Sequence, residues 1–326
     1  MAEITLVEAI NQAMAYEMEA NPDVVVLGED IAKNGGVFRA TVGLLDKFGP
    51  ERVLDTPLAE SMIAGLAVGM AARGLKPIAE FQFMGFIYPA FDEIVNHAAR
   101  MRNRTRGRIT CPVVFRTPFG AGIHAPEHHS ESTEAYFAHT PGLRVVIPSS
   151  PARAYGLLLA SIRDPDPVIF LEPSRLYRYA KQEVKNDGKA LPLDVCFTLR
   201  VGEDVTLVTW GAMVKETLSA ADQLTQAGVS VEVIDVATIK PLDIDTILAS
   251  VEKTGRCIVV HEAPLTCGVG AEIIAKVAEN ALFSLKAPPE RVAGFDTIVP
   301  YARMEKSYIP SEKRIIDAVQ RLMEYT

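Results

Sequence analysis

The sequence predicts an α/β protein in which a parallel-sheet domain is followed by a second, smaller α/β domain. Helical and extended patterns alternate along the chain, as in parallel sheets covered by helices. The segment 111–118 begins with an apolar run and is typical of parallel strands that are buried on both faces. The chain has 326 residues, 48% of them hydrophobic, which is enough for two cores of ordinary size.

The first helix is predicted from Thr5 onward, because apolar side chains then recur at helical spacing. Thr5 can act as N-cap, and Glu8 three residues later completes a capping box. The helix should end at Asn21-Pro22. A β-branched strand follows and ends at Gly28, so Glu29 lies where sites form in parallel sheets.

The remaining elements continue this alternation up to a change of pattern near Asn186-Asp187-Gly188, a turn signal. Residues 1–185 are therefore assigned to the first domain and residues 195–326 to the second. In the first domain we expect a helix over 86–103 and a histidine-rich loop over 119–134. The second domain should be a βαβαβ unit.

The acidic composition excludes some partners. The formal net charge is −8 and the sequence pI is about 5.4, so nucleic acids and anionic membranes would repel the chain. The longest apolar run, 63–72, is shorter than the roughly 18 residues of a membrane span. The N-terminal segment lacks the basic residues of a signal or transit peptide. We expect a cytoplasmic bacterial protein, or a processed protein of the mitochondrial matrix.

The four cysteines include no CxxC pair, and a chain of this size does not depend on disulfides. We expect reduced thiols that are mostly in the core, at positions Cys111, Cys196, Cys257 and Cys267.

The segment 55–83 organises the first domain. Its helix carries Gly65, Gly69 and Gly74 among small apolar residues, so another backbone can approach it closely. Glu60 precedes this apolar stretch. The pattern leaves two interpretations of Glu60 equally open, a first-turn carboxylate favoured by the helix dipole and an acid of a site.

The loop over 119–134 contains His124, His128 and His129, and His139 follows shortly after it. Three interpretations stand: a metal site, one catalytic histidine in a strand-end loop, and ordinary surface histidines. Metal is disfavoured, because there is no HExxH motif and no cysteine nearby.

Two further motifs are expected to be structural. Alternating arginines over 100–108 suit a helix C-terminus and an interface. The glycine-rich turn at 268–270 could hold a phosphate. However, no GxGxxG motif occurs, so NAD binding is not expected.

Several stretches together resemble one known family. They are GED at 28–30, DTPLAE at 55–60, AEFQF at 79–83, FGAGIHAPEHHSES at 119–132 and IPSSPARAYGLLLASIRDPDPVIFLEP at 147–173. They are similar to the β subunit of the thiamine-diphosphate-dependent 2-oxo acid dehydrogenases, and the likeness runs from Ile4 to the C-terminus. It implies a transketolase-like fold, with a pyrimidine-binding parallel-sheet domain first and a smaller C-terminal α/β domain.

The resemblance also implies cofactors and partners. Thiamine diphosphate would lie between this chain and an α subunit in an α2β2 heterotetramer. In the family, the α subunit carries the GDG…N motif that holds magnesium and the diphosphate, and this chain lacks that motif. The acyl group would pass to the lipoyl group of an acyltransferase component.

Two catalytic residues carry over by motif matching. The family glutamate at the position of Glu60 hydrogen-bonds a pyrimidine nitrogen of the cofactor, and an apolar setting would help keep it protonated. In the HSES segment, His129 rather than His128 matches the family histidine, which is implicated in proton transfer during decarboxylation and acylation of the lipoyl group.

Further residues carry over in supporting roles. Phe86 would pack on the pyrimidine ring, and a polar network would link paired active sites. The residues of that network are Glu29, Gln82 and Asp92. A structural potassium ion, held in some relatives, would lie at Asp164 and Asp166.

The substrate remains open at this point. The expected activity is that of pyruvate dehydrogenase; branched-chain 2-oxo acid dehydrogenase and acetoin dehydrogenase are alternatives. A non-catalytic scaffold chain that only docks the acyltransferase is the rival from another class, and Glu60 and His129 argue against it. A one-chain transketolase-like synthase is disfavoured by the missing diphosphate motif.

Overall fold

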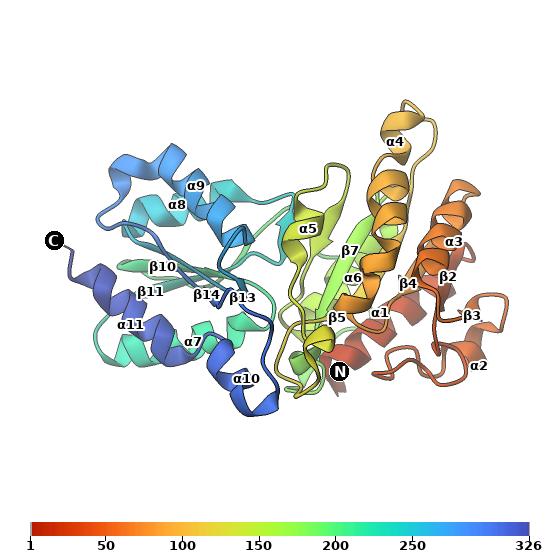
Figure 1. Ribbon diagram of the computed structural model, residues 1–326, viewed down its shortest axis with the longest axis horizontal. Coiled ribbons are helices and arrows are strands. Elements are labelled where there is room, and N and C mark those ends of the chain that lie inside the picture. The colour runs from red at the N-terminus through yellow and green to blue at the C-terminus, as the bar shows by residue number, and fades with distance from the viewer. Residues whose placement is uncertain (1, 326) are drawn as a thin grey trace. The chain divides into compact units, whose positions relative to one another are not determined.

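A computed structural model describes residues 2–325, which form two compact units (Figure 1). The first unit runs up to Phe119 and resumes over Tyr136–Leu193. The second consists of Gly120–Ala135 and the residues from Asp194 on. The histidine loop, which the sequence-based division places in the first domain, is thus grouped with the second unit. Within that unit, the backbone N–H groups of Ala121 and Gly122 donate to the carboxylates of Glu262 and Glu305.

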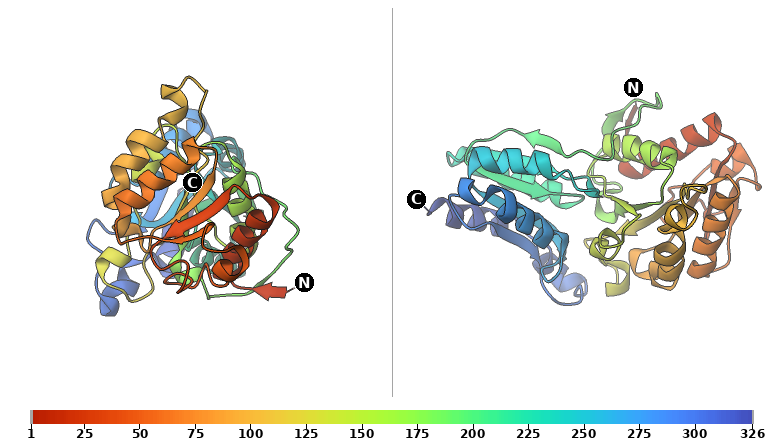
Figure 2. Two further views of the ribbon diagram at one scale, coloured as in Figure 1. Left: turned by 90° about the vertical axis from the view of Figure 1, so that its right-hand side faces the viewer. Right: turned by 90° about the horizontal axis from the view of Figure 1, so that it is seen from above.

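The first unit is built on a parallel sheet, in which its strands follow the order β6-β7-β5-β4-β2-β3. Helix α1 packs against α6, and α3 packs against the short helices η1 and η2. These two groups cover opposite faces of the sheet (Figure 2, left). The strands are β2 (Val24–Gly28), β3 (Val53–Asp55), β4 (Lys76–Glu80), β5 (Val114–Phe119), β6 (Arg144–Val146) and β7 (Val168–Pro173).

The remaining elements of this part of the chain are short strands and helices. Strands β1 and β8 pair antiparallel with each other. The elements are β1 (Ala2–Ile4), β8 (Gln182–Val184), α1 (Leu6–Ala20), α2 (Leu44–Phe48), α3 (Glu60–Ala72), η1 (Met84–Ala90), η2 (Glu93–Ala98), α4 (Met101–Arg104), η3 (Glu127–His129), α5 (Glu134–Ala138), α6 (Pro151–Arg163) and η4 (Ser174–Leu176).

Helix α1 confirms the predicted start and end. The backbone N–H of Glu8 donates to the Thr5 hydroxyl, and Glu8 Oε2 accepts from the Thr5 backbone N–H at 2.7 Å, so both halves of the capping box are present. The helix ends at Ala20, just before Asn21-Pro22. Proline has no backbone N–H and cannot continue the helical hydrogen bonds.

Helix α3 begins at Glu60 and buries one side on the sheet, with Ile63, Ala64 and Ala67 fully enclosed. Gly65 faces the Glu93 carboxyl group, because a β-carbon there would lie 3.5 Å from Cδ of Glu93. A β-carbon at Gly69 or Gly74 would meet no atom within 4 Å, so the predicted close approach of another backbone to this helix stays a prediction.

The segment 86–103 differs from the single regular helix that was predicted. It contains the 3₁₀ turn η1, the π-helical turn η2 and the short helix α4. Pro89 lies inside η1 and has no N–H to donate, which prevents a continuous α-helical hydrogen-bond ladder there.

The second unit is a five-stranded sheet in the order β14-β13-β10-β11-β9, parallel except for β9. Helices α8 and α9 lie on one face, and α7 and α11 on the other (Figures 1 and 2). This confirms the predicted βαβαβ unit. Its elements are β9 (Phe197–Arg200), β10 (Val205–Thr209), α7 (Met213–Gln226), β11 (Val231–Asp235), β12 (Thr238–Lys240), α8 (Ile244–Thr254), β13 (Cys257–Pro264), α9 (Val269–Ala281), η5 (Leu282–Ser284), β14 (Glu290–Gly294), α10 (Ala302–Tyr308) and α11 (Glu312–Met323).

All four cysteines are free thiols, as predicted, and only Cys267 is exposed. Among residues 2–325, no helix has the length and the apolar content to cross a membrane.

Candidate active site

Three predicted site residues follow the carboxyl ends of neighbouring parallel strands. Strand β2 pairs with both β3 and β4, and Gly28 lies opposite Asp55 and Glu80. Glu29 directly follows β2, while Gln82 follows β4 and Glu60 begins the helix after β3. Because carboxyl ends of parallel strands share one edge, the topology brings these polar side chains to the same edge of the sheet.

The pKa of Glu29 is shifted by burial and by neighbouring carboxylates. Partial burial raises the pKa of Glu29 above its ordinary value, and the nearby carboxylates of Asp30 and Glu60 raise this pKa further. Both effects favour the neutral form of the Glu29 carboxyl group.

The expected apolar enclosure of Glu60 is incomplete in this chain. Glu60 is half-buried at the first position of α3, and of its apolar neighbours Ile63 is buried. Leu58 is 71% exposed and Met62 is 41% exposed. The exposed side chains leave one side of the site open to another chain.

The entry to α3 is fixed by hydrogen bonds at the end of β3. Asp55 Oδ1 accepts from the backbone N–H of Ala32 at 2.7 Å, and the N–H of Thr56 donates to the Gly28 carbonyl at 3.0 Å. These bonds tie the segment that leads to Glu60 to the loop after β2.

A row of aromatic rings holds Phe86, which is half-buried. The rings of Phe86 and Phe83 meet edge to face with centroids 5.5 Å apart, and Phe83 meets Phe38 in the same way at 5.5 Å. Phe38 in turn lies 5.0 Å from the ring of Tyr177. The contact with Phe83 restricts the position of the Phe86 ring, and its predicted contact with a pyrimidine ring stays a prediction.

A buried charge network lies beside this row and was not identified from the sequence. Arg116 forms ion pairs with Glu80 and Glu172, and the Tyr177 hydroxyl donates to Glu172 at 2.6 Å. Burial raises the pKa of Glu80, and the Arg116 guanidinium opposes that rise. Charged residues inside the apolar strands at 111–118 and 167–173 were the available signal.

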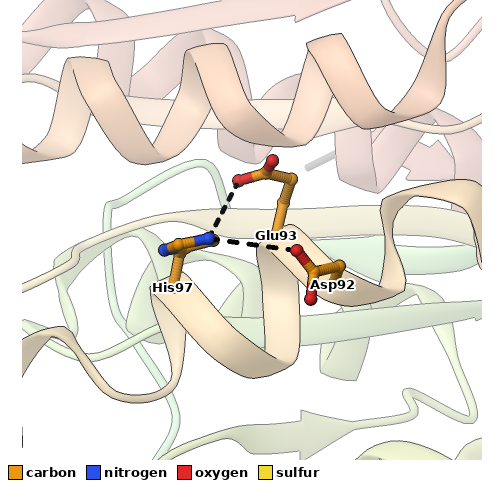
Figure 3. A group of neighbouring side chains, drawn as sticks. All are labelled: Asp92, Glu93 and His97. Atoms are coloured by element: carbon orange, nitrogen blue, oxygen red, sulfur yellow. Dashed lines mark ion pairs between the residues drawn. The ribbon is translucent and has the colours of Figure 1, made fainter.

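Asp92 lies in a group on the surface of the first unit, together with Glu93 and His97 (Figure 3). His97 Nε2 lies 3.9 Å from Asp92 Oδ2 and 4.0 Å from Glu93 Oε2. Asn96 donates to Asp92 at 2.5 Å, so Asp92 has polar partners on its own helix. Its predicted place in a network with Glu29 and Gln82 stays a prediction.

Two histidines of the loop, His124 and His128, have separate carboxylate partners. His124 Nδ1 lies 2.8 Å from Glu305, and His128 Nδ1 lies 3.6 Å from Glu131. His129 is half-buried at the end of η3, and its backbone N–H donates to the Pro126 carbonyl at 2.9 Å. In the described part of the chain, the group of potential metal ligands is the one at Asp92, which includes none of these histidines.

The glycine-rich turn at 268–270 and the aspartates at 164 and 166 both make contacts within their own surroundings. A β-carbon at Gly270 would lie 2.7 Å from Nε2 of His261, so this glycine lets α9 approach that ring. The backbone N–H of Asp166 donates to Oδ1 of Asp164 at 2.8 Å. The carboxylate of Asp164 pairs with Arg144, and that of Asp166 pairs with Arg102. Potassium at Asp164 and Asp166 remains a prediction.

Comparison with known proteins defines the class to which this fold and site belong. The family described as "Transketolase, pyrimidine binding domain" matches residues 2–180, and "Transketolase, C-terminal domain" matches residues 196–315. A solved structure titled "Split gene transketolase, inactive beta4 tetramer" shares the fold with a TM-score of 0.82 over 99% of both chains, at 23% identity. The chain therefore has the predicted transketolase-like fold.

Full-length relatives narrow this class. Proteins named "Pyruvate dehydrogenase E1 component subunit beta" are 49% identical in Staphylococcus epidermidis (strain ATCC 35984) and 48% identical in Bacillus subtilis (strain 168), each over 100% of both chains. The protein of that name in Acholeplasma laidlawii is 52% identical over 99% of this chain and 98% of its own length. The chain belongs to the β-subunit family of the thiamine-diphosphate-dependent 2-oxo acid dehydrogenases, and it is a component of such an enzyme.

Proposed function

We propose that this chain is the β subunit of a pyruvate dehydrogenase. With an α subunit it would carry out the oxidative decarboxylation of pyruvate and the reductive acylation of a lipoyl group on an acyltransferase component. The observation that supports pyruvate as the substrate is the name shared by the full-length relatives at 47–52% identity. That name favours pyruvate over branched-chain 2-oxo acids and acetoin.

The edge of the first sheet fits the pyrimidine part of thiamine diphosphate. It offers a carboxyl group with a neighbouring acid, Glu60 beside Glu29, and a fixed aromatic ring at Phe86. Glu60, Glu29, Gln82 and Phe86 would hold this part of the cofactor. When bound, thiamine diphosphate supplies the carbon nucleophile and the electron sink for decarboxylation.

Glu60 is proposed to keep its proton and to donate a hydrogen bond to a pyrimidine nitrogen. Its carboxyl group lies close enough to that of Glu29 to raise the pKa of Glu29. An α subunit that covers the exposed Leu58 and Met62 would remove water from this position, and removal of water favours the neutral form of a carboxylic acid. This is one reason to propose an α2β2 heterotetramer, in which the α subunit also holds magnesium.

His129 is proposed to move protons during decarboxylation and transfer to the lipoyl sulfur. A histidine suits both directions of transfer because its ordinary pKa lies near neutrality. His129 is half-buried, whereas His128 is exposed and lies near Glu131. This difference supports the choice of His129.

The remaining assignments complete the proposal. Asp92 would take part in a polar network with Glu29 and Gln82, and potassium would lie at Asp164 and Asp166. We place the protein in the cytoplasm, because the relatives compared above are bacterial.

Reconstitution tests the proposed function. The chain is combined with its α subunit, thiamine diphosphate and magnesium, and the decarboxylation of pyruvate is compared with that of 3-methyl-2-oxobutanoate and acetoin turnover. We expect pyruvate to have the highest kcat/KM, and we expect no activity from this chain alone. A higher kcat/KM for another substrate would show that the assignment of pyruvate is wrong. An inactive heterotetramer that still binds the acyltransferase would favour a non-catalytic scaffold chain.

A further inference from the structure

The loop that carries His129 is closed at its base. The backbone N–H of Gly120 donates to the Glu131 carbonyl at 3.0 Å, which brings the two ends of the loop together. Within the loop, Ser130 N–H donates to the Glu127 carbonyl at 3.0 Å. Among the described residues, the loop contributes Ala121 to a small apolar cluster with Val299 and Tyr308. Hydrogen bonds to two buried carboxylates, Glu262 and Glu305, add to this packing.

Glu262, on β13, binds both ends of this loop. Its Oε1 accepts from the backbone N–H of Ala121 at 2.9 Å and from the hydroxyl of Ser132 at 2.9 Å. Gly120 makes room for this carboxylate, because a β-carbon at that position would lie 2.1 Å from the same oxygen. Glu262 is buried, so these hydrogen bonds are protected from water.

Glu305, on α10, binds the first part of the loop. Its Oε1 accepts from the N–H of Gly122 at 2.7 Å, and its Oε2 accepts from the N–H of His124 at 3.2 Å. The same oxygen lies 2.8 Å from His124 Nδ1. Glu305 is only 1% exposed, while the imidazole it contacts is largely in solvent. A buried carboxylate that is bound by two backbone amides fixes the path of the chain.

We propose that Glu262 and Glu305 are positioning residues, which hold the loop 120–132 so that His129 is presented for proton transfer. We call the hydrogen bonds from the loop to Glu262 and Glu305 the tether. The role of His129 in this proposal rests on the proposed function, but the tether itself can be measured separately. The two carboxylates lie on different elements and together accept bonds from both ends of the loop, so each is needed. Sequence motifs did not single out either residue.

Hydrogen exchange tests the tether directly. The assembled α2β2 enzyme is prepared with Glu305→Ala, with Glu262→Ala and with the control Glu279→Ala, which removes an exposed carboxylate from α9 of the same unit. Exchange is followed by mass spectrometry in peptides that cover residues 120–132. We expect exchange to be at least about tenfold faster in the first two variants, since a hydrogen bond to a charged group is lost. Unchanged protection in both would overturn the proposal.

Kinetics test whether the tether acts through His129. Glu305→Ala should lower kcat for acylation of a free lipoyl domain by at least about tenfold, with KM for pyruvate within about twofold of the unmodified enzyme. In a His129→Ala background the same substitution should cause almost no further loss, because the residue it positions is gone. A full, additive loss in that background would contradict a positioning role.

A second variant covers the possibility that Glu305→Ala fails to fold. Glu305→Gln keeps the bulk and one acceptor oxygen, but presents an amide N–H₂ to one of the two backbone donors. It should give a smaller change in both measurements, in the same direction. If His129→Ala left acylation unaffected, the proposed role of His129 would fail, and the exchange measurement would still support or overturn the tether.

Discussion

Arg116 and Glu172 form a bidentate ion pair inside the first sheet. The guanidinium Nε and Nη2 donate to Oε1 and Oε2 of the carboxylate, both at 2.7 Å. Arg116 is 1% exposed and Glu172 is fully buried, so neither charge is stabilised by water. Because Arg116 also pairs with Glu80, one cation pairs with two buried carboxylates, which lie on the two strands that flank its own strand β5.

Replacing Arg116 should therefore destabilise the first domain strongly. In Arg116→Met both carboxylates lose their partner, and breaking a buried pair from one side typically costs about 3–5 kcal/mol. The free energy of unfolding is measured by urea denaturation. Lys47→Met, which removes the cation of an exposed pair with Glu19, serves as control and should change the midpoint little. Equal effects of the two substitutions would contradict the buried-pair interpretation.

Glu60→Gln should leave the fold intact and remove most of the activity. An amide can still occupy the first turn of α3, but it cannot share a proton with the pyrimidine ring. Loss of a positioned acid typically costs about 10²–10⁴-fold in rate. Decarboxylation with an artificial electron acceptor measures this loss in the assembled enzyme. Glu51→Gln, an exposed carboxylate of the same unit, is the matched control, and near-normal turnover of Glu60→Gln would rule out the assignment.

The two adjacent histidines provide an internal comparison. His129→Ala should lower reductive acylation of a lipoyl domain by about 10²-fold or more, whereas His128→Ala should lower it little. Both variants are assayed in the same assembled enzyme with the same lipoyl domain. Equal losses would show that loop geometry, rather than the His129 imidazole, determines the rate.

The elements that could be predicted from the sequence are those with local signals. The capping box at Thr5 and Glu8 fixed the first helix, and strand-end positions drew attention to Glu29 before any resemblance was considered. Glu60 could not be assigned in this way, since a first-turn carboxylate and a site acid have the same local pattern. Its role depended on family resemblance.

Other features depend on contacts between distant parts of the chain. Arg116 and Glu172 are 56 positions apart, and Ala121 and Glu262 are 141 apart. No periodicity or motif within either segment reports such a pairing. For the same reason, the grouping of the loop 120–135 with the second unit could not be recognised from the sequence.

Glu134 should make stability depend on pH. Burial raises the pKa of this carboxyl group to about 7, from an ordinary value of 4.5, despite the hydrogen bond that it accepts from Trp210. Folding therefore takes up a proton between these two pKa values. The contribution of Glu134 to stability is unaffected below pH 4.5, falls as the pH rises to about 7, and is constant above that.

Glu134→Gln should remove this dependence, because the amide keeps an acceptor for Trp210 but does not ionise. The variant is expected to be more stable than the unmodified chain by about 3 kcal/mol above pH 7, and nearly equal to it at pH 4.5. Urea denaturation across this pH range measures the difference, with Glu279→Gln as control. A difference that does not change with pH would show that Glu134 has an ordinary pKa.

Alanine substitutions at Gly120 and Gly43 can distinguish the effect of backbone strain from the effect of a collision with a carboxylate. Both have left-handed backbone angles, with φ of +88° and +78°, so an alanine at either position costs about 1–2 kcal/mol. A β-carbon at Gly43 would have no atom within 4 Å, whereas at Gly120 it would collide with Oε1 of Glu262.

Gly120→Ala should therefore displace the carboxylate that binds Ala121 and Ser132, and so loosen the histidine loop. We expect faster hydrogen exchange over residues 120–132 and a loss of lipoyl acylation. Gly43→Ala should lower stability without changing either measurement. If the two variants differed only in stability, contact between Gly120 and Glu262 would have no bearing on the loop.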